Sequence, residues 1–295
     1  MHPAVPETLE GFCVLHQMFR VRWSELRALA PDRKGAVAAE IAAVFGGFEA
    51  RATEEGQSAA FHLLGHKGDL LLVHFRKTFD ELATAELQLA QTGLAGYLEP
   101  TTSYVSIIEL GLYDATVRLQ EDLRKAGTPA GSEAWNEAFA AMKVEQRGVM
   151  KKRLFPAIPA RRYLCFYPMD KKRGEVKNWY REDIARRAAM MLDHAKIGRS
   201  YAGTVNQIIT GSIGFDDWEW GVDLFADEPT VFKKLVYEMR FDEASADYGL
   251  FGTFYLSMRM PAAQLPAWLD GKLPAYTPPP TAEGSGAPHG RPGPR

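Results

Sequence analysis

Residues 163–171 read Tyr-Leu-Cys-Phe-Tyr-Pro-Met-Asp-Lys, and they begin the segment on which the fold prediction rests. Polar and apolar residues alternate from Arg161 to Met169, and the stretch is rich in aromatic side chains. This pattern predicts a strand that packs on one face. Proline has no N–H to donate to the hydrogen bonds of a sheet, so Pro168 should end the strand. Tyr167 would then lie at the end of the strand.

A helix should follow this strand and span Trp179 to Ile197. Asn178 is a suitable N-terminal cap, and Gly198 can end the helix in the left-handed conformation. His194 lies beside the predicted apolar stripe. A lone histidine is more often structural than a ligand, but a haem needs only one axial protein ligand, so no multi-residue metal motif is required. The predicted apolar stripe consists of Ile184, Ala188, Met191, Leu192 and Ala195.

Predicted elements repeat in two halves of the chain. The second half contains strands at 163–169, 204–210, 217–225 and 252–260, with helices at 179–197 and 230–241. The first contains strands at 12–21, 59–64, 70–75 and 103–110, with helices at 23–48, split at Pro31, and at 79–91. This order is the ferredoxin-like split pattern. The sequence therefore predicts an α+β fold of two tandem ferredoxin-like halves, with two antiparallel sheets packed together and helices outside.

The same reading divides the chain into six segments. They are an N-terminal tail at 1–10, a first ferredoxin-like half at 11–112, a helical connector at 113–160, a second half at 161–261, a short C-terminal helix at 262–276 and a disordered Pro/Gly tail at 277–295. The tail is too poor in apolar residues to fold.

Composition excludes several classes of function. The formal net charge of −2 gives no general attraction to nucleic acid or to anionic membranes. No apolar segment is long enough to span a bilayer, and the first ten residues do not resemble a secretion signal. Cys13 and Cys165 each lie in a predicted strand, where a buried free thiol is more common than a disulfide. We therefore expect a cytoplasmic protein without a membrane span.

Few of the polar residues indicate a particular function when each is considered alone. A tyrosine at a strand end usually packs its ring and hydrogen-bonds its hydroxyl. Four cations flank the ends of elements in or beside the second half and could converge on an anionic ligand with several carboxylates. They are Arg153, Lys171, Arg199 and Arg240. Asp216, Asp217 and Glu219 could serve hydrolysis or bind a divalent metal, but acids are also common at hairpin turns.

Several longer motifs resemble one known family. They are Tyr167-Pro-Met-Asp-Lys-Lys-Arg, Asn178-Trp-Tyr, His194 followed by Gly198-Arg, Tyr201-Ala-Gly, Thr210-Gly-Ser-Ile-Gly-Phe-Asp-Asp-Trp-Glu-Trp-Gly and Tyr237-Glu-Met-Arg-Phe-Asp-Glu-Ala-Ser. In this order and spacing they resemble the coproheme decarboxylases of the chlorite dismutase-like superfamily. The resemblance covers about residues 10–270.

The resemblance implies a dimeric α+β barrel-like subunit, commonly in a homopentamer, with iron porphyrin in the second half. It implies a haem-synthesising oxidoreductase that uses hydrogen peroxide to decarboxylate two propionates of iron coproporphyrin III. The product is haem b, and the substrate is also the redox cofactor. A coproporphyrin ferrochelatase would be a transient partner that supplies it.

The resemblance also assigns residues to roles. It makes His194 the axial iron ligand, Tyr167 the radical that takes hydrogen from a propionate and Lys171 a catalytic cation beside it. The remaining predicted substrate-binding residues are Arg153, Met169, Trp179, Arg199, Gln207, Arg240 and Ser245. We expect a neutral, relatively weak histidine ligand.

Position 207 bears on the alternatives. Chlorite dismutases are similar but place an arginine on the distal side of the iron, whereas this chain has Gln207. A chlorite dismutase-like haem peroxidase, a haem-binding or sensing protein and a ring-forming protein without cofactor remain as alternatives. Two positions depart from the family pattern: Asp170 replaces a small hydroxyl residue and Phe155 replaces a tyrosine, which puts one propionate hydrogen bond in doubt.

Overall fold

The first half of the chain forms four strands and three helices. The computed structural model describes residues 5–276. The elements are β1 (Thr8–Val21), α1 (Trp23–Arg27), α2 (Pro31–Glu49), β2 (Ser58–Leu63), β3 (Leu70–Arg76), α3 (Phe79–Ala90) and β4 (Leu98–Gly111). The predicted split at Pro31 is confirmed, because this proline begins α2. The helix continues to Glu49, one residue beyond the predicted end at 48.

A helical hairpin separates this half from the second. It consists of α4 (Tyr113–Lys125) and α5 (Glu133–Leu154), and Ser132 caps α5 by accepting from the amide of Trp135. The second half follows as β5 (Tyr163–Lys171), α6 (Ile184–Ser200), β6 (Asn206–Gly211), β7 (Trp220–Ala226), α7 (Thr230–Met239), α8 (Glu243–Ala246), β8 (Gly249–Phe251) and β9 (Tyr255–Arg259). The chain then forms α9 (Leu265–Leu269). The six predicted segment boundaries stay predictions, and the predicted tail at 277–295 lies outside the described residues.

The strands of both halves share one antiparallel sheet. Its order is β7-β6-β4-β1-β3-β2-β9-β5-β8, and β7 also pairs with β5, so the hydrogen-bonded order from β7 to β5 closes on itself. The halves join where β4 meets β6, at Ile107 and Gly211, and where β2 meets β9, at Phe61 and Arg259. The α+β fold class is thus confirmed, but the two expected sheets are joined at their edges. Such closure leaves few unpaired strand edges.

Side chains from both halves fill the inside of this closed sheet. The apolar cluster there includes Phe12, Phe61, Phe75, Phe166 and Phe225. A fully buried pair, His16 and Asp223, joins β1 to β7 at 2.9 Å between Nε2 and Oδ1. Apolar side chains and this buried pair thus occupy the interior of the closed sheet.

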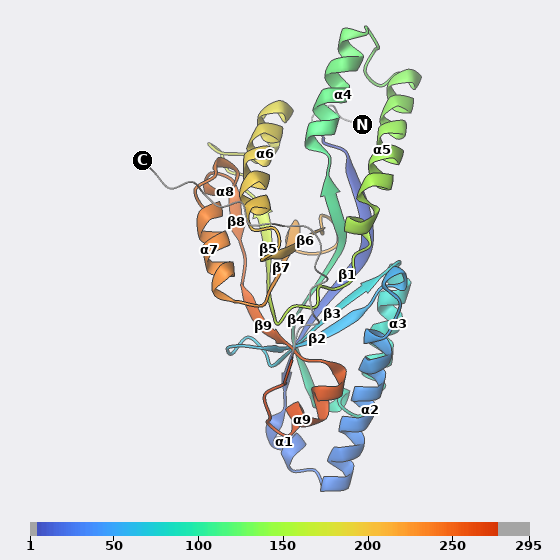
Figure 1. The fold of residues 1–295 in the computed structure, drawn as a ribbon, viewed down its shortest axis with the longest axis vertical. Helices are drawn as coiled ribbons and strands as arrows, with labels where there is room; N and C mark the ends of the chain where they lie inside the picture. Colours follow the sequence, from blue (N-terminus) through green and yellow to red (C-terminus); the bar gives the residue numbers. More distant parts are fainter. Residues whose placement is uncertain (1–4, 277–295) are drawn as a thin grey trace.

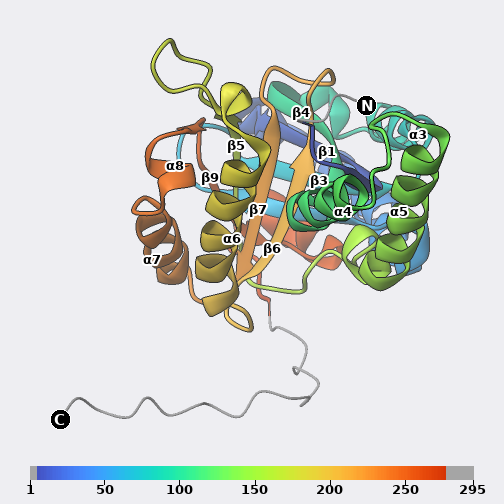
Figure 2. The same ribbon diagram turned by 90° about the horizontal axis from the view of Figure 1, so that it is seen from above.

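The helices cover the outside of the sheet in two groups (Figure 1). α2 and α3 lie over the first-half strands, and α6, α7 and α8 lie over the second-half strands. Seen from above, α6 and α7 run beside β5 and β7, while α4 and α5 lie on the other side of β6 (Figure 2), where α4 contacts α6. No helix within residues 5–276 has both the length and the apolar character that a bilayer crossing requires.

Pro168 does not end β5, contrary to the sequence prediction. The strand continues to Lys171, with Pro168 opposite Gly221 of β7. On its other edge, β5 pairs with β9 up to Phe166 and with β8 from Met169 onward. The proline lies between these two ladders, where its missing N–H removes no ladder bond.

The predicted bounds of the His194 helix also need correction. Asn178 caps only a short 3-10 turn, at Trp179–Arg181, and Asp183 caps α6 by accepting from the amides of Ala185 and Arg186. Gly198 lies inside the helix, which ends at Ser200. The buried stripe of α6 is Ile184, Arg187 and Met190, whereas Leu192 is exposed.

Candidate functional site

His194 is held by the short helix α8. Asp242, the N-terminal cap of α8, lies 2.9 Å from the imidazole, measured from Oδ2 to Nδ1. Ser245 approaches the same ring nitrogen with its hydroxyl at 3.3 Å and donates its amide to Asp242. A carboxylate only accepts hydrogen bonds, so Nδ1 is the protonated nitrogen. The lone pair of Nε2 therefore remains for a metal.

The surroundings of Asp242 keep it ionised. Its side chain is 4% exposed, and that burial alone would raise its pKa. The hydrogen bond and charge of His194, together with the bonds from Ser245, act the other way and bring the pKa below its ordinary value. An imidazole that donates to a carboxylate is a stronger electron donor through its other nitrogen. This contact would strengthen His194 as a ligand, and the expectation of a neutral, relatively weak histidine ligand stays a prediction.

Lys171 lies at the end of β5 and touches the same helix. Its ammonium donates to the carbonyl of Ala244 at 3.0 Å and sits 4.5 Å from the centre of the Trp179 ring. Burial lowers the pKa of this lysine to about 8, although the charges of Asp242 and Glu219 partly oppose the shift. The side chain can therefore lose or gain a proton near neutral pH.

Tyr167 is packed between aromatic side chains on the same face of β5. Its ring stacks on Phe254 with centroids 4.4 Å apart, and Phe251 lies 5.9 Å away. Burial, followed by the neighbouring Cys165, raises its pKa, while Arg240 acts in the opposite sense. Arg240 itself covers Phe251, with 3.8 Å from its guanidinium carbon to the ring centre. The phenol consequently stays protonated across the physiological pH range.

Strand register places Gln207 on this face as well. Gln207 and Cys165 both pair with Leu224 of β7, one from each side, and directly paired residues share a face. Cys165, Tyr167 and Met169 alternate along β5 and so point the same way. The amide of Gln207 donates to the carbonyl of Gly198 in α6 at 3.1 Å. This bond ties the sheet to the helix that carries His194.

The structure thus gathers most, but not all, of the predicted residues. Those that lie around β5, α6, α7 and α8 are Tyr167, Met169, Lys171, Trp179, His194, Gln207, Arg240 and Ser245. Arg153, at the end of α5, and Arg199, at the end of α6, are exposed. Within the described residues neither forms an ion pair with this group. The roles assigned to all these residues stay predictions.

Some side chains serve other contacts than those predicted. The hydroxyl of Ser245 bonds to Asp242 at 3.0 Å, and the ring of Trp179 is buried between Tyr113 and Tyr248. At the departures from the family pattern, Asp170 accepts from the amide of Glu219, and Phe155 packs edge-on against Phe12.

Contacts at the acidic hairpin disfavour the hydrolase alternative. Asp216 accepts the amides of Val105 and Asp217, and Glu219 accepts the amide of Lys171. These carboxylates hold backbone in place. Among residues 5–276, no group of three or more His, Cys, Asp or Glu side chains could hold a metal ion.

Sequence reasoning missed Asp242 and Phe254 as site residues. Asp242 had a usable signal, because aspartate is one of the preferred residues at the N-cap of a helix. Phe254 had none, since only the approach of the β8–β9 connection to β5 brings it to Tyr167.

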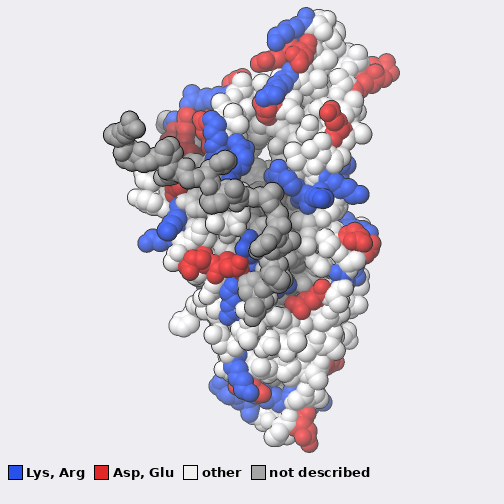
Figure 3. Space-filling model, viewed as in Figure 1, with Lys and Arg blue, Asp and Glu red and all other residues white. Residues whose placement is uncertain are grey.

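The donor set fits an iron porphyrin. One imidazole presents Nε2, and Lys171 and Arg240 lie nearby as partners for carboxylates. On the part of the face around α6 and α7 that Figure 3 leaves visible, charges of both signs are interspersed without a broad field of one sign. Recognition of an anionic ligand would therefore depend on these local cations rather than on overall charge.

Comparison with known proteins identifies the family. The family model described as Chlorite dismutase matches residues 34–260. The chain is 42% identical over 255 residues to a coproheme decarboxylase of Staphylococcus saprophyticus, covering 86% of this chain and 94% of that one. It is 46% identical over 269 residues, 91% of its length, to a Haloquadratum walsbyi protein named "Putative heme-binding protein". The chain spans about half of that protein, 48% of its length.

Solved structures agree on the fold. A heme-binding protein from Thermus thermophilus superposes with a TM-score of 0.78 at 34% identity, covering 91% of this chain and 98% of that one. A chlorite dismutase from Candidatus Nitrospira defluvii gives a TM-score of 0.65 at 17% identity, with 88% and 95% coverage. At that identity the second likeness concerns the fold alone.

Proposed function

Because the chain belongs to the chlorite dismutase family, we propose that it is a coproheme decarboxylase that converts iron coproporphyrin III to haem b. The observation that carries the proposal is the position of α8. This helix contacts the histidine through Asp242 and Ser245, and it contacts Lys171 through the carbonyl of Ala244. Lys171 and Tyr167 share a face of β5. The strand β5 and the helix α8 together therefore position the histidine ligand His194, the cation of Lys171 and the phenol of Tyr167.

The reaction has a simple balance. Each reacting propionate loses carbon dioxide, one hydrogen from the carbon next to the ring and two electrons, and it becomes a vinyl group. Hydrogen peroxide accepts the two electrons with protons and becomes two molecules of water. When bound, the iron porphyrin would react with hydrogen peroxide and so make its oxidising power available in the site.

His194 would hold the iron through its ring nitrogen Nε2. The carboxylate of Asp242 fixes the tautomer and the ring orientation through Nδ1. The same carboxylate would increase the electron donation of the imidazole to a bound metal.

Lys171 and Arg240 orient the propionates. Both are cations on the side of β5 where Tyr167 packs, and each can donate hydrogen bonds to a carboxylate. A fixed carboxylate places the adjacent methylene against the phenol, and positioning of this kind can supply several kcal/mol of a barrier. Arg153, Arg199 and Ser245 are proposed as further contacts at the edge of the site.

Tyr167 is the proposed hydrogen acceptor. Oxidised to a radical by loss of one electron and its proton, it takes a hydrogen atom from the propionate and becomes a phenol again. The carbon radical then gives up the second electron, which peroxide accepts, as the neighbouring carbon loses its carboxylate as carbon dioxide and a double bond forms between the two carbons. Aromatic packing on Phe254 excludes water from the phenol and limits side reactions.

Haem binding without turnover is the second candidate function. The names of the Haloquadratum and Thermus relatives favour it. It would use His194 and the cations but would not require Tyr167. Chlorite chemistry is less favoured, because Gln207 is neutral and its amide is already bonded to α6.

The deciding experiment is mass spectrometry of the bound porphyrin during titration with hydrogen peroxide. We expect two successive losses from the wild type, each of carbon dioxide and two hydrogen atoms. Tyr167→Phe should bind the same porphyrin and lose nothing, whereas Tyr237→Phe, a change at an exposed tyrosine of α7, should behave as wild type. Losses in Tyr167→Phe would remove that residue from the mechanism. No loss in the wild type would leave haem binding as the function.

Assembly and location complete the proposal. We propose a homopentamer in the cytoplasm that receives its substrate from a coproporphyrin ferrochelatase. Cys13 and Cys165 are free and buried, as predicted, which suits a reducing compartment. The native mass of the purified protein measures the oligomer directly.

A further inference from the structure

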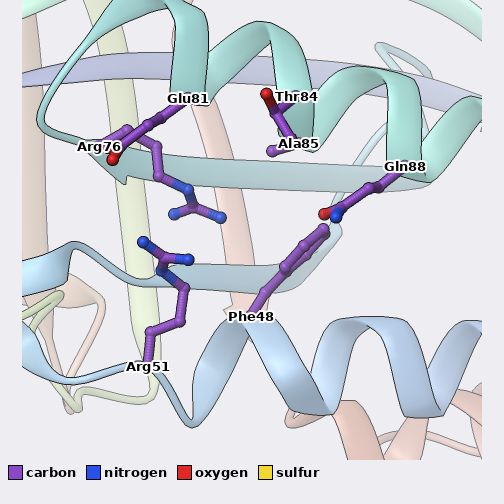
Figure 4. Close-up of a pocket in the computed structure, with 7 residues that line it drawn as sticks. All are labelled: Phe48, Arg51, Arg76, Glu81, Thr84, Ala85 and Gln88. Carbon is purple, nitrogen blue, oxygen red and sulfur yellow. The ribbon is translucent and has the colours of Figure 1, made fainter.

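A second cluster of cations lies in the first half, away from the histidine. The loop after α2 carries Arg51, and β3 ends at Arg76, beside α3 (Figure 4). The two guanidinium groups point toward each other across a cavity of about 120 Å³. Phe48, Thr84 and Gln88 also line it.

Neutral groups hold both guanidinium groups from behind. Arg76 donates from Nη1 to the carbonyls of Gln57 and Phe75 and from Nη2 to the hydroxyl of Ser58. Arg51 donates from Nε to the carbonyl of Gly56 and from Nη2 to that of Glu55. A guanidinium has five N–H donors, so each arginine keeps donors beyond these bonds. The backbone thus orients the two side chains without neutralising them.

The charges of the pair are not balanced by a bonded acid. Within residues 5–276 neither arginine forms an ion pair with a carboxylate. Glu81 stands at the rim, and one of its oxygens accepts the amide of Lys77. Burial, followed by the charge of Arg51, lowers the pKa of Arg76 to about 10, while Glu81 acts in the opposite sense. An anion between the two arginines would relieve this repulsion.

We propose that this pocket binds a small oxyanion of the phosphate class, either free or as the phosphate group of a small ester. Two guanidinium groups that approach from opposite sides suit a tetrahedral anion, because each can donate to different oxygens. A flat carboxylate would be gripped well by only one of them. The cavity exceeds what one water molecule requires and leaves space for such a group.

The site is separate from the proposed porphyrin site. Its residues come from α2, β3, α3 and the loop after α2, whereas the histidine cluster comes from β5, α6, α7 and α8. The binding of phosphate here therefore does not depend on the proposed decarboxylation.

Calorimetric titration of the full chain with inorganic phosphate, at constant ionic strength and without porphyrin, tests the proposal. We expect saturable binding by the wild type and at least about tenfold weaker binding by Arg51→Gln, since bonds to charged groups are the stronger ones. Arg118→Gln removes the same charge from an exposed ion pair on α4 and should retain wild-type affinity. Arg240→Gln tests whether phosphate binds instead beside the proposed porphyrin site. Acetate should bind more weakly than phosphate, and phenyl phosphate should show whether an ester is accepted beside Phe48.

Each contrary result overturns the assignment. Absence of saturable phosphate binding would do so, as would an Arg51→Gln variant with unchanged affinity. Loss of binding in Arg240→Gln alone would place the phosphate in the second half. Equal affinity for acetate would contradict the phosphate class. Circular dichroism of each variant confirms that the compared chains are folded.

Discussion

The two halves share an order of elements but use the space under their first long helix differently. In the first half, α2 buries Val37, Ile41, Phe45 and Phe48, and the cluster it joins extends to α3 and α9. In the second, α6 packs mainly against α4, α7 and α8 and leaves His194 partly exposed. The first half thus fills this space with apolar side chains, whereas the second half places polar groups there beside its own apolar cluster.

This division has an energetic reason. Burying an apolar side chain contributes roughly 1.5–3 kcal/mol, so the first-half cluster can stabilise the whole closed sheet. Buried polar groups contribute little net free energy and are costly when unpaired. A site that needs Lys171, Asp242 and Tyr167 close together therefore requires stability from elsewhere in the chain.

Phe45→Ala gives the largest effect we expect. The ring is 1% exposed and contacts Phe48, with centroids 5.4 Å apart. Its removal should lower the free energy of unfolding by about 3–5 kcal/mol. Urea denaturation measures the loss, and porphyrin affinity below the transition should not change. A matched His194→Ala change should do the reverse, abolishing axial ligation with little change in stability. Equal effects of both variants on stability and on affinity would contradict the division of roles.

Asp242→Asn tests the polar half directly. The amide keeps the shape of the side chain but removes the charge that His194 donates to. We expect about 10–100-fold weaker iron-porphyrin binding, the usual cost of losing an outer hydrogen-bond partner of a metal ligand. The reduction potential of the bound iron should rise, because the imidazole donates fewer electrons. Ser245→Ala, which leaves the carboxylate, is the control. An unchanged potential in Asp242→Asn would show that the carboxylate does not tune His194.

Local sequence signals were enough for much of the fold. Pro31 marked the split before α2, and the alternation from Arg161 to Met169 marked β5. They failed where distant segments decide the outcome. Pro168 is tolerated because the partner of β5 changes from β9 to β8 at this residue. No local sequence pattern contains that information. The closure of the sheet likewise depends on pairing between β4 and β6 and between β2 and β9.

The candidate site shows the same limit. The motifs named most of its residues, and the structure brings the majority together around α8. Tyr167 or His194 alone would have stayed an ordinary structural residue. Asp242 escaped notice because its importance comes from a contact with a residue 48 positions away. Arg153 and Arg199 were grouped with the others by charge alone, and charge does not determine where a side chain lies.

Lys171 should make porphyrin binding dependent on pH. Its pKa of about 8 means that the free protein loses this charge as the pH rises, whereas a bound propionate would favour the charged form. The affinity for porphyrin should thus be highest well below pH 8 and should fall by about tenfold between pH 7 and pH 9. Fluorescence quenching by the porphyrin measures it. Lys171→Met should bind more weakly at pH 7 and show no such dependence. A wild-type affinity that is flat across this range would exclude Lys171 as a propionate partner.

Asp183→Ala should have the smallest effect and should be confined to one half. Asp183 accepts from the amides of Ala185 and Arg186 at the start of α6, whereas Ala30, at the start of α2, offers no side-chain cap. Because α6 packs mainly on other helices, its first turn depends on this cap. We expect a loss of about 1 kcal/mol, seen as faster amide exchange in α6 with α2 unchanged. Asp183→Asn should restore most of the protection, since the amide oxygen still accepts. If exchange in both helices increased equally, the halves would open together, and the independence of the two helix layers would have to be abandoned.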